Sequence, residues 1–511
     1  MENTEYTKNA TDPAAEPQTP SGGRRWLGFF AVLTAIIMNL LDSTVVNVAA
    51  PSIRTGLGAS YADLQWIAAG YTLALAVGLM TGGRLGDLFG RRAMLMTGVV
   101  GFASASLGCA LAPDPRMLIA ARVLQGLFGA VMVPQCFGLL RDLFPPAELG
   151  KAFGALGPVI GLSTILGPIV AGTLVDANLF GTGWRMVFGI NLPLAAFTVI
   201  AGFKALPRAT RSAKAHRLDG VGALLAGTAM FLLVYPLVQG REQGWPAWMA
   251  LVAAASVAVF ALFAVHQARR SRRGAATLVE FSVLTKRSYA GGTLFVLVFF
   301  GAIVGFSLAV GLLLQLGLGY SPTHAALTMV AWAVGAFLGS GFGAVMMHKL
   351  NRRILHLGLS IMAVSLVGLY LVFTHSGTGL SGWDLAPELG GYGFGMGMIF
   401  VPLFDIVMGE VRDHEVGSAS AILESLQQLG ASIGVAGLGT VFFSTIGTRP
   451  ALAAFLLAGE RVTLITIGLV VLAFVLGFLL PHRARQAAPV TTGADFEAVN
   501  EGATEQELVG V

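Results

Sequence analysis

The longest stretch without a charged residue is the feature that most constrains the fold of this chain. From Ser288 to His348 the sequence contains no Lys, Arg, Asp or Glu. A water-soluble domain could not hide such a stretch, whereas two membrane-spanning helices of about 20 residues and one short turn would use it fully. The composition agrees, because 55% of the 511 residues are hydrophobic and only 12% are charged. The sequence therefore predicts a polytopic membrane protein.

Hydropathy in windows of about 20 residues predicts an all-α protein with fourteen membrane helices. The first six cover about 26–49, 62–83, 93–112, 116–137, 152–175 and 187–206. The other eight cover about 218–238, 247–266, 289–313, 323–347, 353–374, 385–409, 416–445 and 460–480. We therefore expect a six-helix bundle at 26–206, two inserted helices within 207–288 and a second six-helix bundle at 289–480. Residues 1–25 and 481–511 are polar without an apolar face, so we expect disordered tails.

The distribution of Lys and Arg predicts the orientation of these helices, because cytoplasmic loops collect positive charge. With both termini in the cytoplasm, 25 of the 32 Lys and Arg residues fall on the cytoplasmic side and six fall outside. Only Arg122 falls inside a helix. Losing one helix would invert every later loop and destroy this bias. The net charge of +5 therefore reports topology, and its spread over many short loops argues against nucleic-acid binding.

An internal repeat divides the chain into two similar halves. Residues 82–92 read GGRLGDLFGRR and residues 343–353 read GAVMMHKLNRR, which aligns Gly90 with Asn351 at a shift of 261. Gly and Asn accept a positive φ most readily, so both loops are expected to turn at the same point. A repeat of six helices, separated by two inserted helices, is the parallel-repeat plan of a transporter.

Asp42 is the most informative charged residue, because it lies in an otherwise uncharged run from Leu27 to Pro51. A carboxylate at that depth costs roughly 2.5 to 3.5 kcal/mol on insertion scales, and such residues usually face a bundle interior, a water-filled cavity or an ion path. No other residue of this helix can compensate its charge. A protonatable acid in this position indicates a transporter.

Other polar residues lie within or near the ends of predicted helices. Arg122 lies in the middle of helix 116–137 and must find an acceptor or water. Glu424 lies about two turns inside helix 416–445, whose Ser and Gln neighbours make one face polar enough for a wet cavity. We interpret Glu424 as a residue that binds substrate or protons. Asp405 lies nearer the end of its helix, so a solvated position is as compatible with the sequence as a functional one. His324 and His348 also lie near helix ends, where an interfacial position suits them better than a role in a proton relay.

The loop after the second helix combines glycines, an acid and two arginines. Gly83 and Gly90 permit a tight turn, Asp87 can pair with an arginine or cap a helix, and Arg91 and Arg92 suit a cytoplasmic surface. In this spacing the loop resembles the signature of the major facilitator superfamily, in which it would form a cytoplasmic gate. The alternative is a simple topological turn with positive-inside arginines.

Further motifs narrow the resemblance to the fourteen-helix drug:proton antiporter branch of that superfamily, over Leu40 to about Gly477. The segment from Asp42 through Asn47 to Pro51 is similar to its helix 1 signature, and Arg122 with Gln125 and Gly126 is similar to its helix 4 motif. The antiporter motif of helix 5 is matched by Gly157, Pro158, Gly161, Gly167, Pro168 and Gly172. The start of helix 6 is matched by Trp184, Arg185, Phe188, Asn191 and Pro193. Three residues depart from the usual pattern: Ala171, Glu424 and Gln427.

The resemblance implies a proton-coupled exporter of small amphipathic or cationic compounds that works by alternating access in the plasma membrane as a monomer. Asp42, Arg122 and Glu424 would couple protons to substrate, with Asp405, Gln125 and Asn47 as further candidates. The alternatives are a dedicated exporter of one metabolite or self-made antibiotic, and a non-transporting membrane sensor or scaffold.

Chemistry at a cofactor is not expected. No nucleotide-binding loop of the form G-x-x-x-x-G-K-[ST] occurs, so the expected energy source is the proton gradient rather than ATP. No nucleophile with a base and no metal-ligand cluster supports an enzyme. The two cysteines, Cys109 and Cys136, lie in apolar runs and are interpreted as buried thiols.

Overall fold

The computed structural model describes residues 22–145, 148, 166–207, 219–240, 242–273, 275, 277–278, 287–375, 379–408, 411, 416–447 and 451–480. Within these residues all regular secondary structure is helical, and thirteen helices are long and apolar enough to cross a membrane. The prediction of an all-helical membrane fold is therefore confirmed. The predicted fifth helix appears as the apolar helix Leu166–Ala177, and residues 152–165 lie outside the described part of the chain.

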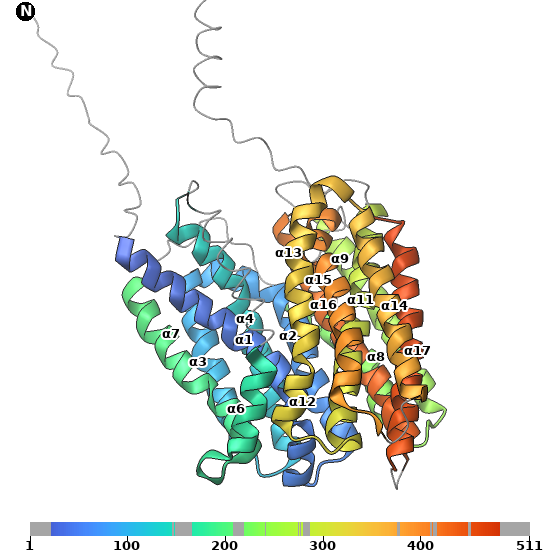
Figure 1. Ribbon diagram of the computed structural model, residues 1–511. Helices are drawn as coiled ribbons and strands as arrows, with labels where there is room; N and C mark the ends of the chain where they lie inside the picture. The colour runs from blue at the N-terminus through green and yellow to red at the C-terminus, as the bar shows by residue number, and fades with distance from the viewer. Residues whose placement is uncertain are drawn as a thin grey trace, which may run out of the picture.

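The first half of the chain forms the blue to green bundle in Figure 1. Its helices are α1 (Gly22–Leu57), α2 (Tyr61–Phe89), α3 (Arg91–Ala110), α4 (Pro115–Leu143), the helix Leu166–Ala177, α6 (Met186–Gly189) and α7 (Asn191–Ala205). The short 3-10 turns η1 (Leu179–Gly181) and η2 (Gly183–Arg185) precede α6. Helix α1 begins at Gly22, so residues 22–25 are helical and not part of a tail; residues 1–21 lie outside the described part.

The second half forms the yellow to red bundle, with two inserted helices beside it (Figure 1). The inserted helices are α8 (Gly220–Gln239) and α9 (Trp248–Arg272). The second bundle contains α11 (Arg287–Leu312), the π-helical turn η3 (Leu313–Gly317), α12 (Pro322–Thr328), α13 (Val330–Leu350), α14 (Arg353–His375), α15 (Gly382–Val407), α16 (Val416–Ile446) and α17 (Leu452–Gly477). The predicted helix 323–347 is thus divided into α12 and α13.

Short polar side chains begin several of these helices. The Ser60 hydroxyl caps α2 by accepting a hydrogen bond from the Asp63 amide, and the Asp63 carboxylate accepts one from the Ser60 amide. Asp114 caps α4 and Asp219 caps α8 in the same way. Such caps satisfy backbone N–H groups that a helix start leaves unpaired.

Glycines hold neighbouring helices at very close range. A Cβ atom built on Gly434 of α16 would lie 2.0 Å from the Gly301 carbonyl oxygen of α11, and one on Gly397 of α15 would lie 2.0 Å from the Ala336 carbonyl oxygen of α13. In the first half, a Cβ atom on Gly82 of α2 would lie 2.0 Å from the Ala130 carbonyl oxygen of α4. Small residues allow helix backbones to approach this closely. Membrane helices depend on such close packing because the hydrophobic effect does not drive their association within lipid.

The predicted turn at Gly90 and Asn351 is confirmed. Their φ angles are 91° and 47°, in the region that favours these two residue types. The segment that precedes Gly90 is not a loop, because α2 continues to Phe89 and places Gly83 and the backbone of Asp87 in its last turns. A single residue, Gly90, therefore separates α2 from α3.

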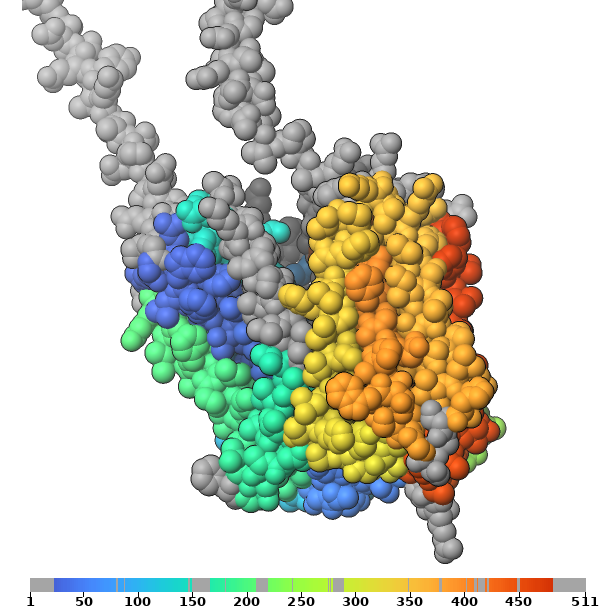
Figure 2. All heavy atoms as spheres, viewed as in Figure 1, coloured from blue at the N-terminus to red at the C-terminus, as the bar shows by residue number. Residues whose placement is uncertain are grey.

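The two bundles contact each other at the end of the molecule away from Gly22 and Leu480, which we call the distal end; the opposite end is the terminal end. Tyr61 of α2 stacks on Phe443 of α16 with ring centroids 4.2 Å apart, and Gln65 Nε2 donates to the Ala436 carbonyl at 3.2 Å. Thr323 N donates to Asp176 Oδ2 at 2.9 Å. Towards the terminal end the surface is hollowed between the bundles (Figure 2). The bundles thus meet distally and diverge towards the terminal end.

The glycine seam between α11 and α16 generates a stability prediction. Gly434→Ala should lower the free energy of unfolding by about 1 to 3 kcal/mol, because its Cβ meets backbone that cannot move aside. The matched control is Gly437→Ala in the same helix, where an added Cβ meets nothing within 4 Å. Thermal unfolding of the purified protein in detergent measures the stability of both variants. Equal stability for the two would contradict close backbone packing between α11 and α16 at Gly434.

Candidate functional site

The first bundle contains a buried ion pair. Asp42 of α1 and Arg122 of α4 are each 1% exposed, and Arg122 Nη1 donates a hydrogen bond to Asp42 Oδ2. The residues are 80 positions apart in the chain, so helix packing alone brings them together. The charge that compensates Asp42, which α1 itself lacks, therefore comes from α4.

Two amide side chains complete the surroundings of the Asp42 carboxylate. Gln125 Nε2 and Asn191 Nδ2 donate to Asp42 Oδ1 at 2.7 and 3.1 Å. Both amide nitrogens also donate to the Ser106 hydroxyl oxygen, at 2.7 and 3.1 Å. Ser106 in turn donates to the Phe102 carbonyl at 2.9 Å. The carboxylate is thus held by donors from α4 and α7 that a hydroxyl of α3 orients.

The guanidinium of Arg122 has its own set of partners. Its Nε donates to the Ile67 carbonyl at 3.1 Å, and its Nη1 donates to Gln125 Oε1 at 2.7 Å. The Tyr71 ring lies under it, with the Cζ atom 4.1 Å from the ring centroid. A cation above an aromatic face is stabilised most where water is absent. These contacts attach α2 to the pair.

The polar cluster consists of Asp42, Ser106, Arg122, Gln125 and Asn191, and it connects α1, α3, α4 and α7. Removing one partner of a buried ion pair leaves an uncompensated buried charge and is strongly destabilising. The mutual arrangement of these four helices therefore depends on Asp42 and Arg122 remaining paired.

Glu424 lies in the other bundle, on α16, and is not part of the polar cluster. Its side chain is half-buried and accepts a hydrogen bond from Gln428. Two neighbouring polar atoms, Ser425 Oγ and Gln427 Oε1, are buried without a hydrogen-bond partner in the described part of the chain. Buried polar atoms in native proteins nearly always have a partner. This stretch of α16 therefore offers free hydrogen-bonding capacity to water or a ligand.

The predicted gate residues Arg91 and Arg92 make their described contacts within the first bundle. Arg91 Nη1 forms an ion pair with Asp142 Oδ1 of α4 at 3.0 Å, and Arg92 donates to the carbonyl groups of Phe203 and Leu206. The side chain of Asp87 lies outside the described part. Arg91 and Arg92 thus tie the start of α3 to α4 and α7.

The remaining predicted positions are dispersed. A Cβ on Gly167 would lie 2.7 Å from Thr44 Oγ1 of α1, and one on Gly172 would lie 2.7 Å from the Pro322 carbonyl oxygen of the second bundle. Pro168 is half-buried in the same helix, while Gly157, Pro158 and Gly161 lie outside the described residues. Asn47 is half-buried on α1, and Asp405 is exposed near the end of α15. Of the candidates whose side chains the structure describes, it therefore brings together Asp42, Arg122 and Gln125 and leaves the others apart from this group.

Two residues of the site, Ser106 and Tyr71, are not among those expected from the sequence, and Asn191 is expected only as part of the helix 6 motif. Ser106 and Asn191 form hydrogen bonds within the carboxylate network, and Tyr71 lies against Arg122. The hydroxyl of a serine in an apolar helix usually bonds the backbone of its own helix, so the residue type alone does not indicate a functional site. An asparagine within an apolar helix indicates a site more strongly, because its amide needs hydrogen-bond partners in a dry interior.

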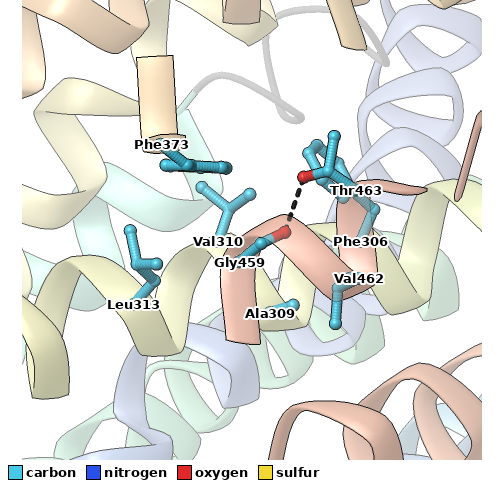
Figure 3. Close-up of a pocket in the computed structure, with 8 residues that line it drawn as sticks. All are labelled: Phe306, Ala309, Val310, Leu313, Phe373, Gly459, Val462 and Thr463. Carbon is cyan, nitrogen blue, oxygen red and sulfur yellow. Dashed lines mark hydrogen bonds between the residues drawn. The ribbon is translucent and has the colours of Figure 1, made fainter. Parts of the chain in front are cut away.

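A small cavity lies within the second bundle. The small cavity between α11, α14 and α17 measures about 10 Å³, enough for one water molecule, and is lined mainly by apolar side chains (Figure 3). The Thr463 hydroxyl beside it donates to its own helix, at the Gly459 carbonyl. Nor does any group of three His, Cys, Asp or Glu residues among those described come together as a metal site.

The polar cluster generates a prediction for Ser106. Ser106→Ala should destabilise the protein by about 1 to 3 kcal/mol and impair transport, because two buried amide groups lose a shared acceptor and can turn away from Asp42. Ser104→Ala is the matched control, since that exposed hydroxyl only bonds the Val100 carbonyl of the same helix. Thermal unfolding and transport rates of both variants provide the measurement. Indistinguishable variants would exclude an orienting role.

Comparisons with known proteins agree with this architecture. The family model described as Major Facilitator Superfamily matches residues 32–435. A probable actinorhodin transporter of Streptomyces coelicolor is 48% identical over 84% of this chain and 74% of its own length. The tetracenomycin C resistance and export protein of Streptomyces glaucescens is 34% identical over 86% of this chain and 81% of its own length.

A solved structure extends the comparison to the fold. A bacterial homologue of the human lysosomal transporter Spinster, in an inward-facing and occupied conformation, superposes with a TM-score of 0.65. The match covers 90% of this chain and 97% of that one at 16% identity, so it supports the fold alone. Together with the matching family model, these likenesses show that the chain belongs to the Major Facilitator Superfamily of transporters.

Proposed function

We propose that this protein is a proton-coupled antiporter that exports small amphipathic or cationic compounds by alternating access. The observation that carries the proposal is the buried ion pair between Asp42 and Arg122. A protein that only needed a stable bundle would gain more from apolar residues there, because burying two charges is often no better than burying well-packed hydrophobic side chains. A titratable pair is useful where a proton must be bound and released during a cycle.

Coupling follows from the contacts of the pair. When Asp42 carries its charge, Arg122, Gln125 and Asn191 converge on it and hold α1, α4 and α7 in one arrangement. When a proton neutralises Asp42, Arg122 loses its counter-charge and favours an arrangement that offers another acceptor or water. Protons moving down their gradient drive this exchange, at about 2.3 kcal/mol per charge per 100 mV of membrane potential.

Substrate binding is assigned to α16. Glu424 supplies a negative charge, and the unpartnered oxygens of Ser425 and Gln427 supply hydrogen-bond acceptors and a donor. In this arrangement the Glu424 carboxylate of the second bundle attracts a cationic substrate, while the ion pair of the first bundle binds and releases the proton. The two functions are then separated between the bundles that move relative to each other.

Orientation follows from the positive residues. We assign the terminal end to the cytoplasm and the distal end to the outside, in the plasma membrane, with the protein acting as a monomer. In the present conformation the distal contacts at Tyr61, Gln65 and Thr323 are closed, so substrate would enter from the terminal side. Export would require those contacts to open.

A dedicated antibiotic exporter is the second candidate. The relatives named for actinorhodin and tetracenomycin C favour it, because each name specifies a single antibiotic. Efflux measured over a panel of structurally unrelated compounds separates this candidate from a multidrug exporter. Transport of one chemical class only would favour the dedicated exporter.

Asp42→Asn tests the coupling role. The variant should lose export driven by a pH gradient, since Asn keeps the volume of Asp but cannot titrate. It should also lose about 3 to 5 kcal/mol of stability, because Arg122 remains buried without a counter-charge. Efflux in proteoliposomes with an imposed pH gradient measures the first effect and thermal unfolding the second.

A second variant separates coupling from folding. Asp42→Asn combined with Arg122→Gln removes both charges and should recover part of the stability without recovering gradient-driven export. Gradient-driven export at the wild-type rate in that double variant would exclude the pair as the coupling site.

Glu424→Gln tests the substrate role. The change removes a charge but keeps hydrogen bonding, so export of a cationic compound should fall at least tenfold more than export of a neutral compound of the same shape, if about 1.4 kcal/mol of attraction is lost. Initial efflux rates of the matched pair of compounds provide the measurement. An equal fall for both compounds would assign Glu424 to proton binding instead.

A further inference from the structure

An apolar groove lies between α2 and the inserted helix α8, outside the proposed transport path. It measures about 480 Å³ and is lined by Val77, Ala223, Leu224, Gly227, Thr228 and Phe231. Leu224 is 71% exposed and Phe231 is 44% exposed, so the groove faces the surroundings of the bundle. In a membrane those surroundings are lipid.

Both walls of the groove lead to charged residues at the terminal end. On α2, Arg84 lies about two turns beyond Val77 on the same helix face. Arg84 Nη2 donates to the Thr277 carbonyl, in the segment that follows α9. On α8, the wall residue Ala223 lies about one turn from the helix cap Asp219. The apolar groove thus ends at a polar rim.

The rim on the α8 side is a tight cluster around Asp219, which is 1% exposed. His266 Nε2 lies 3.0 Å from Asp219 Oδ1, Gln267 Nε2 donates to Oδ2 at 2.7 Å, and Arg270 Nε lies 3.5 Å from Oδ2. Burial raises the pKa of Asp219, but the hydrogen bonds from His266, the Gly222 amide and Gln267, with the charge of Arg270, outweigh it and lower that pKa below its usual value. Among the described residues of this rim Asp219 is the one acid, and it is ionised and already paired.

Three further arginines stand beside this cluster without an acidic partner. Arg269, Arg272 and Arg273 end α9, are exposed, and make no ion pair within the described part of the chain. One face of α9 packs against α8, where Ser256 donates to the Ala229 carbonyl, and the other face is exposed, since Leu251, Val257 and Leu262 are all more than half exposed. Counted over the described residues, the rim consequently carries an excess of positive charge, and it lies at the end of helices that are long and apolar enough to cross a membrane.

We propose that the groove and its arginine rim form a binding site for an anionic phospholipid. One acyl chain packs along Val77, Leu224 and Phe231, and the phosphate headgroup lies among Arg269, Arg272 and Arg273. Basic residues next to a membrane helix attract anionic lipid, and the apolar groove adds a surface that a free phosphate cannot use. The bound lipid would join the inserted helices to α2.

The test compares lipids of opposite headgroup charge on the full-length protein. Purified protein is mixed with equal amounts of phosphatidylglycerol and phosphatidylcholine, and the retained lipid is identified by native mass spectrometry. Phosphatidylglycerol should be retained preferentially, and Arg272→Gln should weaken its retention about fivefold. Arg141→Gln is the matched control, because this exposed arginine lies at the terminal end of α4. Equal retention of the two lipids, or equal effects of the two substitutions, would overturn the proposal.

A second variant tests the groove separately from the charge. Thr228→Trp fills the groove and should reduce phosphatidylglycerol retention, whereas Leu251→Trp on the exposed face of α9 should not. Excess inorganic phosphate should fail to displace the lipid. Displacement of the lipid by phosphate, or unchanged phosphatidylglycerol retention in Thr228→Trp, would contradict a lipid site. So would a Thr228→Trp variant that loses substrate binding but retains the lipid, because the groove would then bind substrate.

Discussion

The ion pair between Asp42 and Arg122 is the interaction on which the first bundle depends. Two charges that are each 1% exposed cannot rely on water, so every helix around them contributes a partner. Arg122 and Gln125 come from α4, Asn191 from α7, and Ser106 from α3. Because a buried charge that loses its partner is strongly destabilising, the pair and its hydrogen bonds favour one mutual arrangement of these helices.

Close backbone packing at glycines is a second source of rigidity, and it occurs in both bundles. In the second bundle the helices approach through glycines such as Gly301, Gly434 and Gly397, where even a methyl group would meet backbone, and Gly82 of the first bundle makes the same kind of contact. Backbone contacts of this kind involve no charged group, whereas the polar cluster of the first bundle is organised around a buried ion pair. Under the proposed function, a proton would act on that ion pair and leave the glycine contacts unchanged.

The sequence predicted the elements of the structure better than their pairing. Hydropathy and repeat alignment identified the membrane helices, and the residue types at Gly90 and Asn351 predicted the positive φ angles. The same reasoning identified Asp42 and Arg122 one by one, because a charge within an apolar run is conspicuous.

Their partnership was not predictable in this way, since periodicity places a residue on a face of its own helix and does not say which other helix meets that face. Ser106 is the clearest example: only the packing of α3 against α4 and α7 turns an ordinary serine into the acceptor shared by two amides.

The inserted helices add a constraint that two six-helix halves alone would lack. Helix α8 contacts both halves at the distal end: Trp66 of α2 stacks on Phe231 with centroids 5.6 Å apart, and Thr440 of α16 donates to the Leu237 carbonyl at 2.6 Å. Gln65 of α2 also lies within hydrogen-bonding distance of that threonine hydroxyl, at 3.4 Å. The same residues therefore connect the two halves to each other and to α8. If the distal end opens during transport, α8 must follow one half and release the other, and the aromatic stack with α2 favours its staying with the first.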